Sequence, residues 1–482
     1  MRSYMKSNIT ALFLVLFTAH SLFAGDDIDR TKRPVAKPVP KVQLPDIQKA
    51  TLKNGLQVWL VEYHELPTVA FNLVIETGSD HDPLTMPGLA SMTADVLDEG
   101  TTTRTSLQIS DEIESIGASF STSSGVDGSF ITLFTLKKHI DKALEVFADV
   151  LIHPTFPQKE FERLRKQRLT ALIQQRDQPV AIANNAYSHI LYGSDHPYGN
   201  NPSGSEASLT AMTTDDLKKF YSMYYRPNHA TLIIVGDLTM KDIIGTLNLD
   251  LDEWKPADIM GFNIPAPHAI DAMHVYLIDK PGASQSEVRI GYPALERSTP
   301  DFFPVEVMNR MLGGQFSSRI NLNLREKHGY TYGARSGFGY RKGIGPFTAQ
   351  GGIVTEKTDS AVKEFLSEIN GMKTQGMSAD ELTFIKKGMI GGFALIFETP
   401  TQIAGALQNI VLYGLPENYY QNYLQNIDAV TLGEVNRVAQ KYLDASKMAI
   451  VVVGDLAKVK QGIESMHFGD TVLCDVDGKP IK

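Results

Sequence analysis

The sequence predicts an α+β fold of two homologous domains, each an antiparallel-dominated sheet covered by helices on one face. Length is the first reason, because 482 residues exceed what one ordinary hydrophobic core accommodates. An internal repeat is the second: Thr213–Leu238 and Thr431–Leu456 align without a gap, 218 residues apart. The third reason is that strand patterns occur in hairpins with helical patterns between them, which is typical of α+β domains.

Each copy of the repeat combines a helix with a strand. A threonine, Thr213 or Thr431, precedes a helical pattern as an N-cap would, and a tyrosine occupies the same place in both helices. After a break, a β-branched run ends in Gly-Asp-Leu in both copies. Agreement in helix, break, strand and final tripeptide makes a chance alignment improbable.

In the first half, residues 52–60 read as a hairpin around the Asn54-Gly55 turn. A strand is expected at Val69–Thr77 and an amphipathic helix at Gly88–Leu97. Three further helices follow from apolar spacing, at Leu107–Ile116, Ile140–Leu151 and Pro157–Arg176. We therefore predict an N-terminal domain over residues 49–253.

The second half repeats this order after a proline-containing linker, residues 254–272. Strands are expected at Val275–Asp279 and Ser286–Tyr292, and a helix at Phe302–Leu312. The predicted C-terminal domain covers residues 273–482.

The N-terminus has the pattern of an export signal. Residues 1–24 combine Arg2 and Lys6 with an apolar run that ends at Ala24, a small residue suited to cleavage. A retained membrane anchor is the alternative, but the run is short for a span. Residues 25–48 are rich in proline and read as an extended leader. With a single cysteine and no internal disulfide, an exported chain of this kind suits the periplasm or another exported location.

Net charge argues against nucleic acid and anionic lipid as partners. The chain carries a formal charge of −9, and removal of two positive residues with the signal gives −11. No segment after the signal is long and apolar enough to predict an integral membrane helix.

Residues 311–339 hold the densest set of candidate functional residues. Gly313, Gly314 and Gln315 form a glycine loop, and the run from Arg325 to His328 leads to Tyr330 and Tyr332. Glycines cluster in this way where backbone approaches another surface closely. From residue types alone, Arg325 is expected to pair with a local carboxylate and Tyr332 to be a core ring.

This stretch resembles the C-terminal half-site of the insulinase/pitrilysin peptidases, which include the mitochondrial processing peptidases. There the motif reads roughly LGGG-x-SSR…LREK-x-G-x-x-Y. The resemblance implies that Arg325 and Tyr332 are catalytic and reach across a cavity to a peptide held at a zinc site. It also implies that Gly313, Gly314, Gln315 and, more weakly, Tyr330 contact the substrate or a partner subunit.

The zinc motif of this family is missing. Catalytic members carry His-x-x-Glu-His on one helix, which supplies two zinc ligands and a general base, and a distal ligand on another helix. The flanking framework survives here as Gly88-Leu89-Ala90 and Gly100-Thr101. The four functional positions fall on Ser91, Ala94, Asp95 and, within about a residue, Ala171. Asp95 is expected to be a solvated or locally paired helix residue.

No other metal or catalytic motif replaces it. None of the twelve histidines lies three to five residues from another, so no helical chelating pair exists. Gly-x-Ser-x-Gly, Gly-x-x-x-x-Gly-Lys and Cys-x-x-Cys are absent from the sequence. We therefore expect no cofactor in this chain.

In two-chain members of the family, one subunit holds zinc and its partner supplies the Arg and Tyr. The resemblance therefore implies an exported non-zinc subunit of a heterodimeric peptidase, with Zn on a zinc-bearing insulinase-like partner. The substrate would be a peptide or an unfolded protein. The alternative is a catalytically inactive binding or assembly protein of the cell envelope. An independent enzyme with an unrecognised site is a third hypothesis.

Overall fold

The computed structural model describes residue 31 and residues 46–481. The predicted signal, residues 1–24, and nearly all of the predicted leader lie outside the described residues. Everything below concerns the compact unit of residues 42–482. Within residues 46–481, no helix combines the length and the hydropathy needed to span a bilayer.

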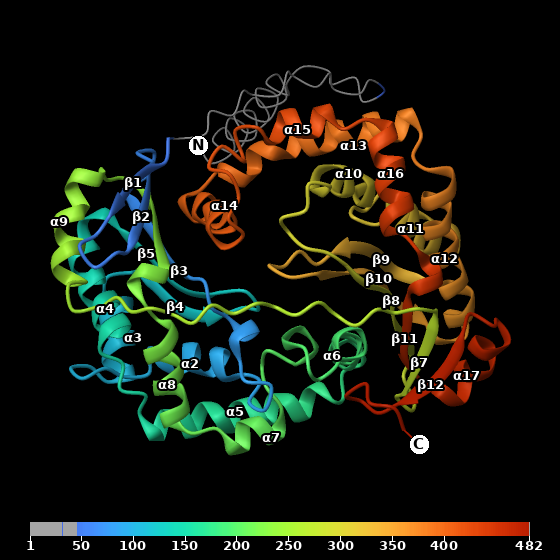
Figure 1. Cartoon of the computed structure of the whole chain (residues 1–482), viewed down its shortest axis with the longest axis horizontal. Helices are drawn as coiled ribbons and strands as arrows, with labels where there is room; N and C mark the ends of the chain where they lie inside the picture. Colours follow the sequence, from blue (N-terminus) through green and yellow to red (C-terminus); the bar gives the residue numbers. More distant parts are fainter. Residues whose placement is uncertain (1–30, 32–45, 482) are drawn as a thin grey trace, which may run out of the picture. The chain divides into compact units, whose positions relative to one another are not determined.

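The first half forms a mixed six-stranded sheet (Figure 1). Its strand order is β1 (Gln48–Thr51), β2 (Gln57–Glu62), β6 (Ala230–Gly236), β3 (Thr68–Ile75), β5 (Ser129–Leu136) and β4 (Ser119–Ser124). Only the β2–β6 pair is parallel, and all the other neighbours are antiparallel. The expected hairpin around Asn54-Gly55 joins β1 and β2.

The second half forms a sheet of the same design. Its order is β12 (Asp470–Cys474), β7 (His274–Asp279), β11 (Ala449–Gly454), β8 (Gln285–Leu295), β10 (Gly345–Val354) and β9 (Thr331–Phe338). The pairing senses from β7 to β9 match those from β2 to β4 of the first sheet. Only the outer strand differs, since β12 comes from the end of the chain and pairs in parallel with β7. The predicted fold class of two homologous α+β halves is confirmed.

The repeated segments occupy equivalent places. Capping boxes begin both helices, α8 (Thr214–Tyr224) and α16 (Leu432–Tyr442), and both strands are buried along their whole length. Close approach of a neighbouring strand in the sheet explains why each Gly-Asp-Leu tripeptide begins with glycine. A Cβ at Gly236 would lie 2.4 Å from the Thr68 carbonyl oxygen, and one at Gly454 would lie 2.5 Å from the Ser286 hydroxyl.

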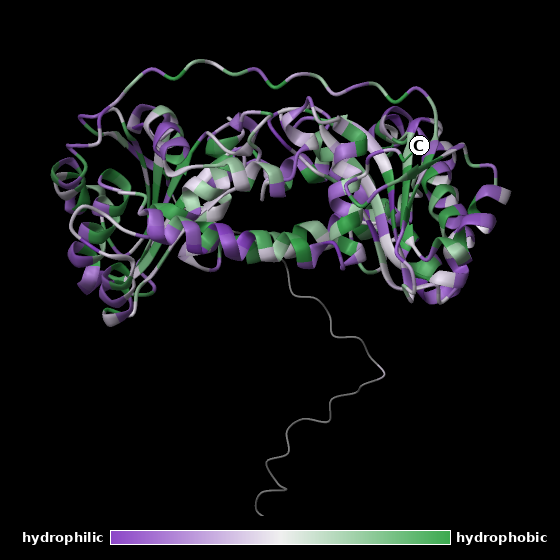
Figure 2. Cartoon of the chain, turned by 90° about the horizontal axis from the view of Figure 1, so that it is seen from below, coloured by the Kyte–Doolittle hydropathy of each residue, from purple (hydrophilic) through white to green (hydrophobic). Residues whose placement is uncertain are grey.

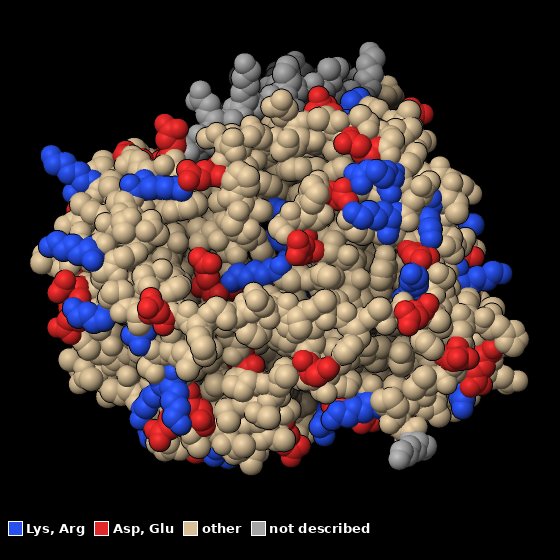
Figure 3. Space-filling model, in the orientation of Figure 1, with Lys and Arg blue, Asp and Glu red and all other residues tan. Residues whose placement is uncertain are grey.

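Each sheet packs one face against helices of its own half, and hydrophobic strand segments are visible in both halves (Figure 2). In the first half these helices are α2 (Leu89–Leu97), α3 (Ser106–Ser115), α4 (Ile140–Ile152), α5 (Gln158–Gln175), α7 (Glu206–Ala211), α8 and α9 (Met240–Asp250). In the second half they are α10 (Phe302–Leu312), α11 (Arg319–Asn321), α12 (Thr358–Gln375), α13 (Ala379–Gly392), α15 (Tyr423–Ala429), α16 and α17 (Leu456–Ser465). On the face drawn in Figure 3, acidic and basic side chains are interspersed.

The opposite face of each sheet is partly covered by a helix from the other half, an arrangement that was not predicted. Helix α6 (Pro179–Tyr192) packs Ile182 and Ala186 against the β11 residues Val451 and Val453 of the second sheet. The hydroxyl of Tyr187 fixes α6 there by donating to the Phe347 carbonyl at 2.8 Å.

Helix α14 (Pro400–Leu412) makes the reciprocal contact on the first sheet (Figure 1). Its Ile403 and Leu407 pack with Ile233 and Val235 of β6. The Asn72 amide of β3 donates to the Gln408 side chain at 2.8 Å. Covering both faces explains why β6 and β11 are continuous apolar runs rather than alternating ones.

Residues 255–273 connect the two sheets without a helix or strand. Most of the predicted linker, 254–272, is therefore irregular backbone. The domain bounds 49–253 and 273–482 stay predictions, because α6 and α14 each lie against the sheet of the other half.

One carboxylate ties the repeated helix α16 to α10. Asp301 directly precedes α10 and is 6% exposed. It accepts hydrogen bonds from Arg437 at 2.7 Å, Lys441 at 2.8 Å and the Tyr442 hydroxyl at 2.7 Å. The hydrogen bond from Arg437 is the largest cause that holds the pKa of Asp301 far below its ordinary value.

We predict that Asp301→Asn lowers the free energy of unfolding by about 2 kcal/mol at pH 7, because two charge-assisted hydrogen bonds lose their charge. The folded-state pKa lies below the ordinary value of about 4, so this stabilisation is complete above pH ~4 and shrinks as the pH falls further. Urea denaturation at pH 7 and at pH values below 4 measures the difference. The exposed Asp215→Asn is the control, and equal stability of Asp301→Asn and wild type at pH 7 contradicts the prediction.

Candidate functional site

The helix expected to carry zinc ligands, α2, carries an ion pair instead. Asp95, at the second histidine position, pairs with Arg168 of α5, the helix that would supply the distal ligand. Ser91 is half-buried, Ala94 is buried and Ala171 is exposed. Burial raises the pKa of Asp95, and the adjacent Arg168 opposes that rise. Asp95 is therefore paired, but with an arginine of another helix rather than with a local one.

These residues do not fit a zinc ion. One carboxylate, one hydroxyl and an arginine supply too few ligands and place a positive charge where a dication would lie. Across residues 46–481, no group of three or more His, Cys, Asp and Glu side chains is arranged to hold a metal.

The framework of Gly88-Leu89-Ala90 and Gly100-Thr101 around α2 serves the fold. The carboxylate of Asp82 accepts from the backbone N–H groups of Gly88 and Ala90 at 2.7 Å each, which caps the start of the helix. At the other end, the Thr101 hydroxyl donates to Asp149 at 2.6 Å. These contacts need no metal, so the framework persists without the ligands.

The cavity beside the glycine loop, unlike the position on α2, is open. Arg325 and Tyr332 line one cavity of about 550 Å³. Tyr332, on β9, is 89% exposed, and its hydroxyl makes no hydrogen bond within residues 46–481. It is not the core ring that residue types alone predicted.

Arg325 lies on η5 (Leu322–Lys327), a π-helical segment, which is a geometry often found at functional sites. Its guanidinium is 3.4 Å from Glu326 and 4.7 Å from the centre of the Phe316 ring. The expected local carboxylate is therefore present as the next residue. Arg325 still lines the cavity and remains partly exposed.

The glycine loop lies on the same cavity and also closes the edge of the sheet. Gly313 accepts a hydrogen bond from Ser336 N–H of β9 at 3.0 Å, and a Cβ at 313 would lie 2.2 Å from that nitrogen. Gly314 and Gln315 line the cavity beside it. Tyr330 does not line the cavity; it packs against the core and stacks on His328 with ring centres 4.9 Å apart.

The polar residues of this cavity that sequence reasoning missed include Arg289, Arg335 and Gln350. Arg289 is 4% exposed, donates to Glu287 at 2.9 Å, and donates to Asn184 of α6 at 3.0 Å. The available signal was the pair of charged residues at alternate positions of strand β8, Glu287 and Arg289, because residues two apart in a strand share one face of the sheet.

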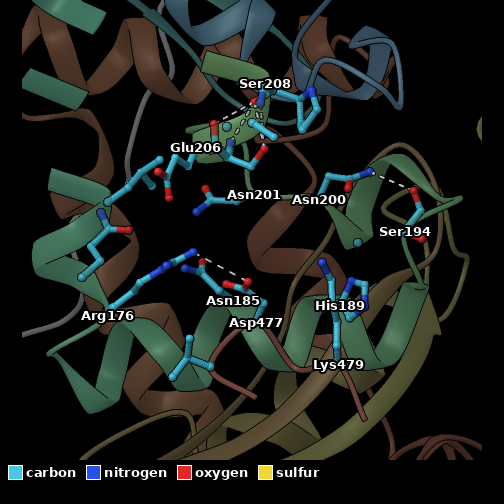
Figure 4. A pocket seen from close by; sticks show the side chains of 18 of the residues that line it. Arg176, Asn185, His189, Ser194, Asn200, Asn201, Glu206, Ser208, Asp477 and Lys479 are labelled. Atoms are coloured by element: carbon cyan, nitrogen blue, oxygen red, sulfur yellow. Dashed lines mark hydrogen bonds and ion pairs between the residues drawn. The ribbon is translucent and has the colours of Figure 1, made fainter. Parts of the chain in front are cut away.

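Two of the other cavities in this compact unit contain polar or ionisable side chains that bear on the site. One, of about 400 Å³, shares Arg289, Arg335, Ser336 and Gln350 with the first, so the two form one groove. The other, of about 300 Å³, is separate and lies between α5, α6, the 199–208 segment and the turn at Asp477–Lys479 (Figure 4). There burial lowers the pKa of His189.

Comparison with known proteins identifies the family of both halves. The family model described as insulinase (peptidase family M16) matches residues 57–197, and the one described as peptidase M16 inactive domain matches residues 211–389. Together these matches cover more than half of the chain.

Relatives are similar over nearly their whole length. An uncharacterized zinc protease of Bacillus subtilis is 24% identical over 401 residues, covering 82% of this chain and 95% of the relative. A non-peptidase homolog of Helicobacter pylori is 26% identical over 403 residues, covering 83% and 92%. The crystal structure of a peptidase M16 inactive domain from Pseudomonas fluorescens aligns with a TM-score of 0.79 at 27% identity, covering 85% and 98%. With both family models matched in order, the chain belongs to the insulinase (M16) family of peptidases.

Proposed function

We propose that this chain is an exported non-zinc subunit of a heterodimeric M16 peptidase, and that it supplies Arg325 and Tyr332 to the active site of a zinc-bearing partner. One observation carries the proposal. The chain has a closed, ion-paired zinc position but an open cavity in which Arg325 and the Tyr332 hydroxyl have hydrogen-bond donors to spare.

Chemistry divides naturally in this way. Zinc held by the partner would supply the activated water for peptide hydrolysis. Arg325 and Tyr332 would donate hydrogen bonds to the carbonyl oxygen of the peptide and to the negative charge that develops on it. Donors need only the correct position, so they can come from a second chain.

Known relatives support a division of roles within the family. The relatives named above include one called a zinc protease and one called a non-peptidase homolog, at similar identity to this chain. A pair of such chains would combine one metal site with one Arg/Tyr pair.

A catalytically inactive binding or assembly protein of the cell envelope is the second candidate. The closed zinc position and the name of the Helicobacter pylori relative favour it. Purification from the native source under mild conditions distinguishes the two. A co-purifying chain of similar size with His-x-x-Glu-His supports the split peptidase, and an envelope complex without one supports the assembly role.

Metal content tests the proposal directly. We expect the purified chain to hold far less than one zinc per chain and to cleave no peptide alone, because Ser91, Ala94 and Asp95 replace both histidines and the base. Elemental analysis and a peptidase assay measure this. One tightly bound zinc per chain would falsify the prediction.

Export is tested by the N-terminus. We expect the mature chain to begin at or near Gly25 and to be found outside the cytoplasm, because residues 1–24 have the pattern of a cleaved signal. Cell fractionation and N-terminal sequencing measure this, and a cytoplasmic chain that keeps Met1 contradicts it.

Substitution tests the role of the Arg/Tyr pair. Arg325→Ala or Tyr332→Phe, mixed with the intact partner, should lower turnover roughly a hundred- to a thousand-fold, equivalent to about 3–4 kcal/mol of transition-state stabilisation. Melting temperature and heterodimer formation should change little, because Tyr332 is 89% exposed.

Lys327→Ala is the matched control for Arg325, since it removes another cation from η5 that does not line the cavity. Full activity of Tyr332→Phe would show that the Tyr332 hydroxyl takes no part in the reaction. Full activity of Arg325→Ala as well would favour the assembly role.

A further inference from the structure

The groove formed by the two adjoining cavities has a floor of three strands. Strand register places Arg289 of β8 opposite Gln350 of β10, and Gln350 opposite Arg335 of β9. Direct cross-strand partners share one face of a sheet and lie about 5 Å apart at Cα. Arg289, Gln350 and Arg335 therefore form one row of side chains across the groove, which we call the arginine row.

Glycines surround this row. In the neighbouring registers on the same face, Gly352 lies opposite Glu287, and Gly337 lies opposite Thr348. Gly333 and Gly351 also line the groove. Because these positions carry no side chains, the row rises from a floor where an extended backbone could lie close to the sheet.

The two arginines are not equivalent. Arg289 is buried and already engaged, with Glu287 at 2.9 Å and Asn184 at 3.0 Å. Arg335 is exposed, and within residues 46–481 its side chain makes no ion pair or hydrogen bond. The side chain of Gln350 likewise has no hydrogen-bond partner there, so its amide donors are unused.

Charge in the groove opposes the charge of the chain. Taken together, the two cavities are lined by four charged residues, Arg289, Arg325, Arg335 and Glu287. Three positive charges and one negative charge sum to +2. The whole chain carries −9. A locally positive groove in an acidic protein attracts an acidic ligand and disfavours a basic one.

We propose that the arginine row selects an acidic side chain of an extended peptide lying in the groove, with Arg335 and Gln350 as the donors to its carboxylate. Arg335 is then the residue that determines specificity. This inference rests on the proposed function and deepens it, because it names the peptide class that the cavity beside Arg325 and Tyr332 holds.

Geometry favours a peptide over a compact anion. The groove extends past the row on both sides, from Phe316 and Tyr332 to Phe338 and Gly339. The exposed rings of Phe316 and Tyr332 and the glycines along the groove can contact further residues of a peptide. A small inorganic anion has no such further groups to bind there.

Equilibrium binding by the isolated purified chain tests the inference without a partner or turnover. The probes are two short fluorescein-labelled peptides of Gly, Ala and Ser that differ only in one central residue, Glu or Gln. We expect fluorescence anisotropy to show about tenfold tighter binding of the Glu peptide than of the Gln peptide at low salt. This difference in affinity should become smaller as NaCl is added.

Arg335→Ala should abolish the difference between the peptides, and Arg335→Glu should prefer a third peptide with Lys at the centre. This inversion is a readout that a merely structural role would not give. Arg163→Ala, an arginine on α5 outside the groove, is the matched control and should keep the tenfold difference.

Equal or absent binding of the Glu and Gln peptides by the wild-type chain overturns the inference, as does an undiminished preference in Arg335→Ala. Inorganic phosphate tests for a site that binds free anions. If phosphate displaces the Glu peptide at a concentration equal to the dissociation constant of that peptide, the groove is a free-anion site and the inference is overturned. Tyr332→Phe separates the two proposals, because it should keep the peptide preference even if turnover with the partner falls.

Discussion

Two helices that cross between the halves determine much of this structure. Each sheet has an apolar second face, and its own half leaves that face uncovered. Helix α6 covers part of one and α14 part of the other, so burial of apolar surface in either half requires the other half to be folded. A chain cut at the linker would expose both faces.

This exchange also builds the groove. Val180 and Asn184 of α6 line it, and Asn184 orients the buried guanidinium of Arg289. The floor of the groove therefore comes from the second half and one wall from the first. Binding of a peptide there would therefore require both halves to be folded.

How much the sequence predicts depends on the distance over which the determining contacts act. The α10 bounds, Phe302–Leu312, agree with the prediction because apolar spacing along a helix is a local signal. The repeat predicts two equivalent sheets, because a helix followed by a buried strand is a local pattern too.

Helical periodicity gives α6 and α14 an apolar face but does not say which sheet that face meets. The arginine row depends on the register of three strands, which no single segment encodes. Exposure separates Tyr332 from Tyr330, two residues that look alike in the sequence.

The ion pair of Asp95 with Arg168 limits how a metal site could be engineered into this chain. Asp95→His would leave the half-buried guanidinium of Arg168 without its carboxylate, next to the place where a dication would bind. Arg168→Ala alone would leave Asp95 partly buried and unpaired. Introducing zinc ligands at this position therefore requires both members of the pair to be replaced together.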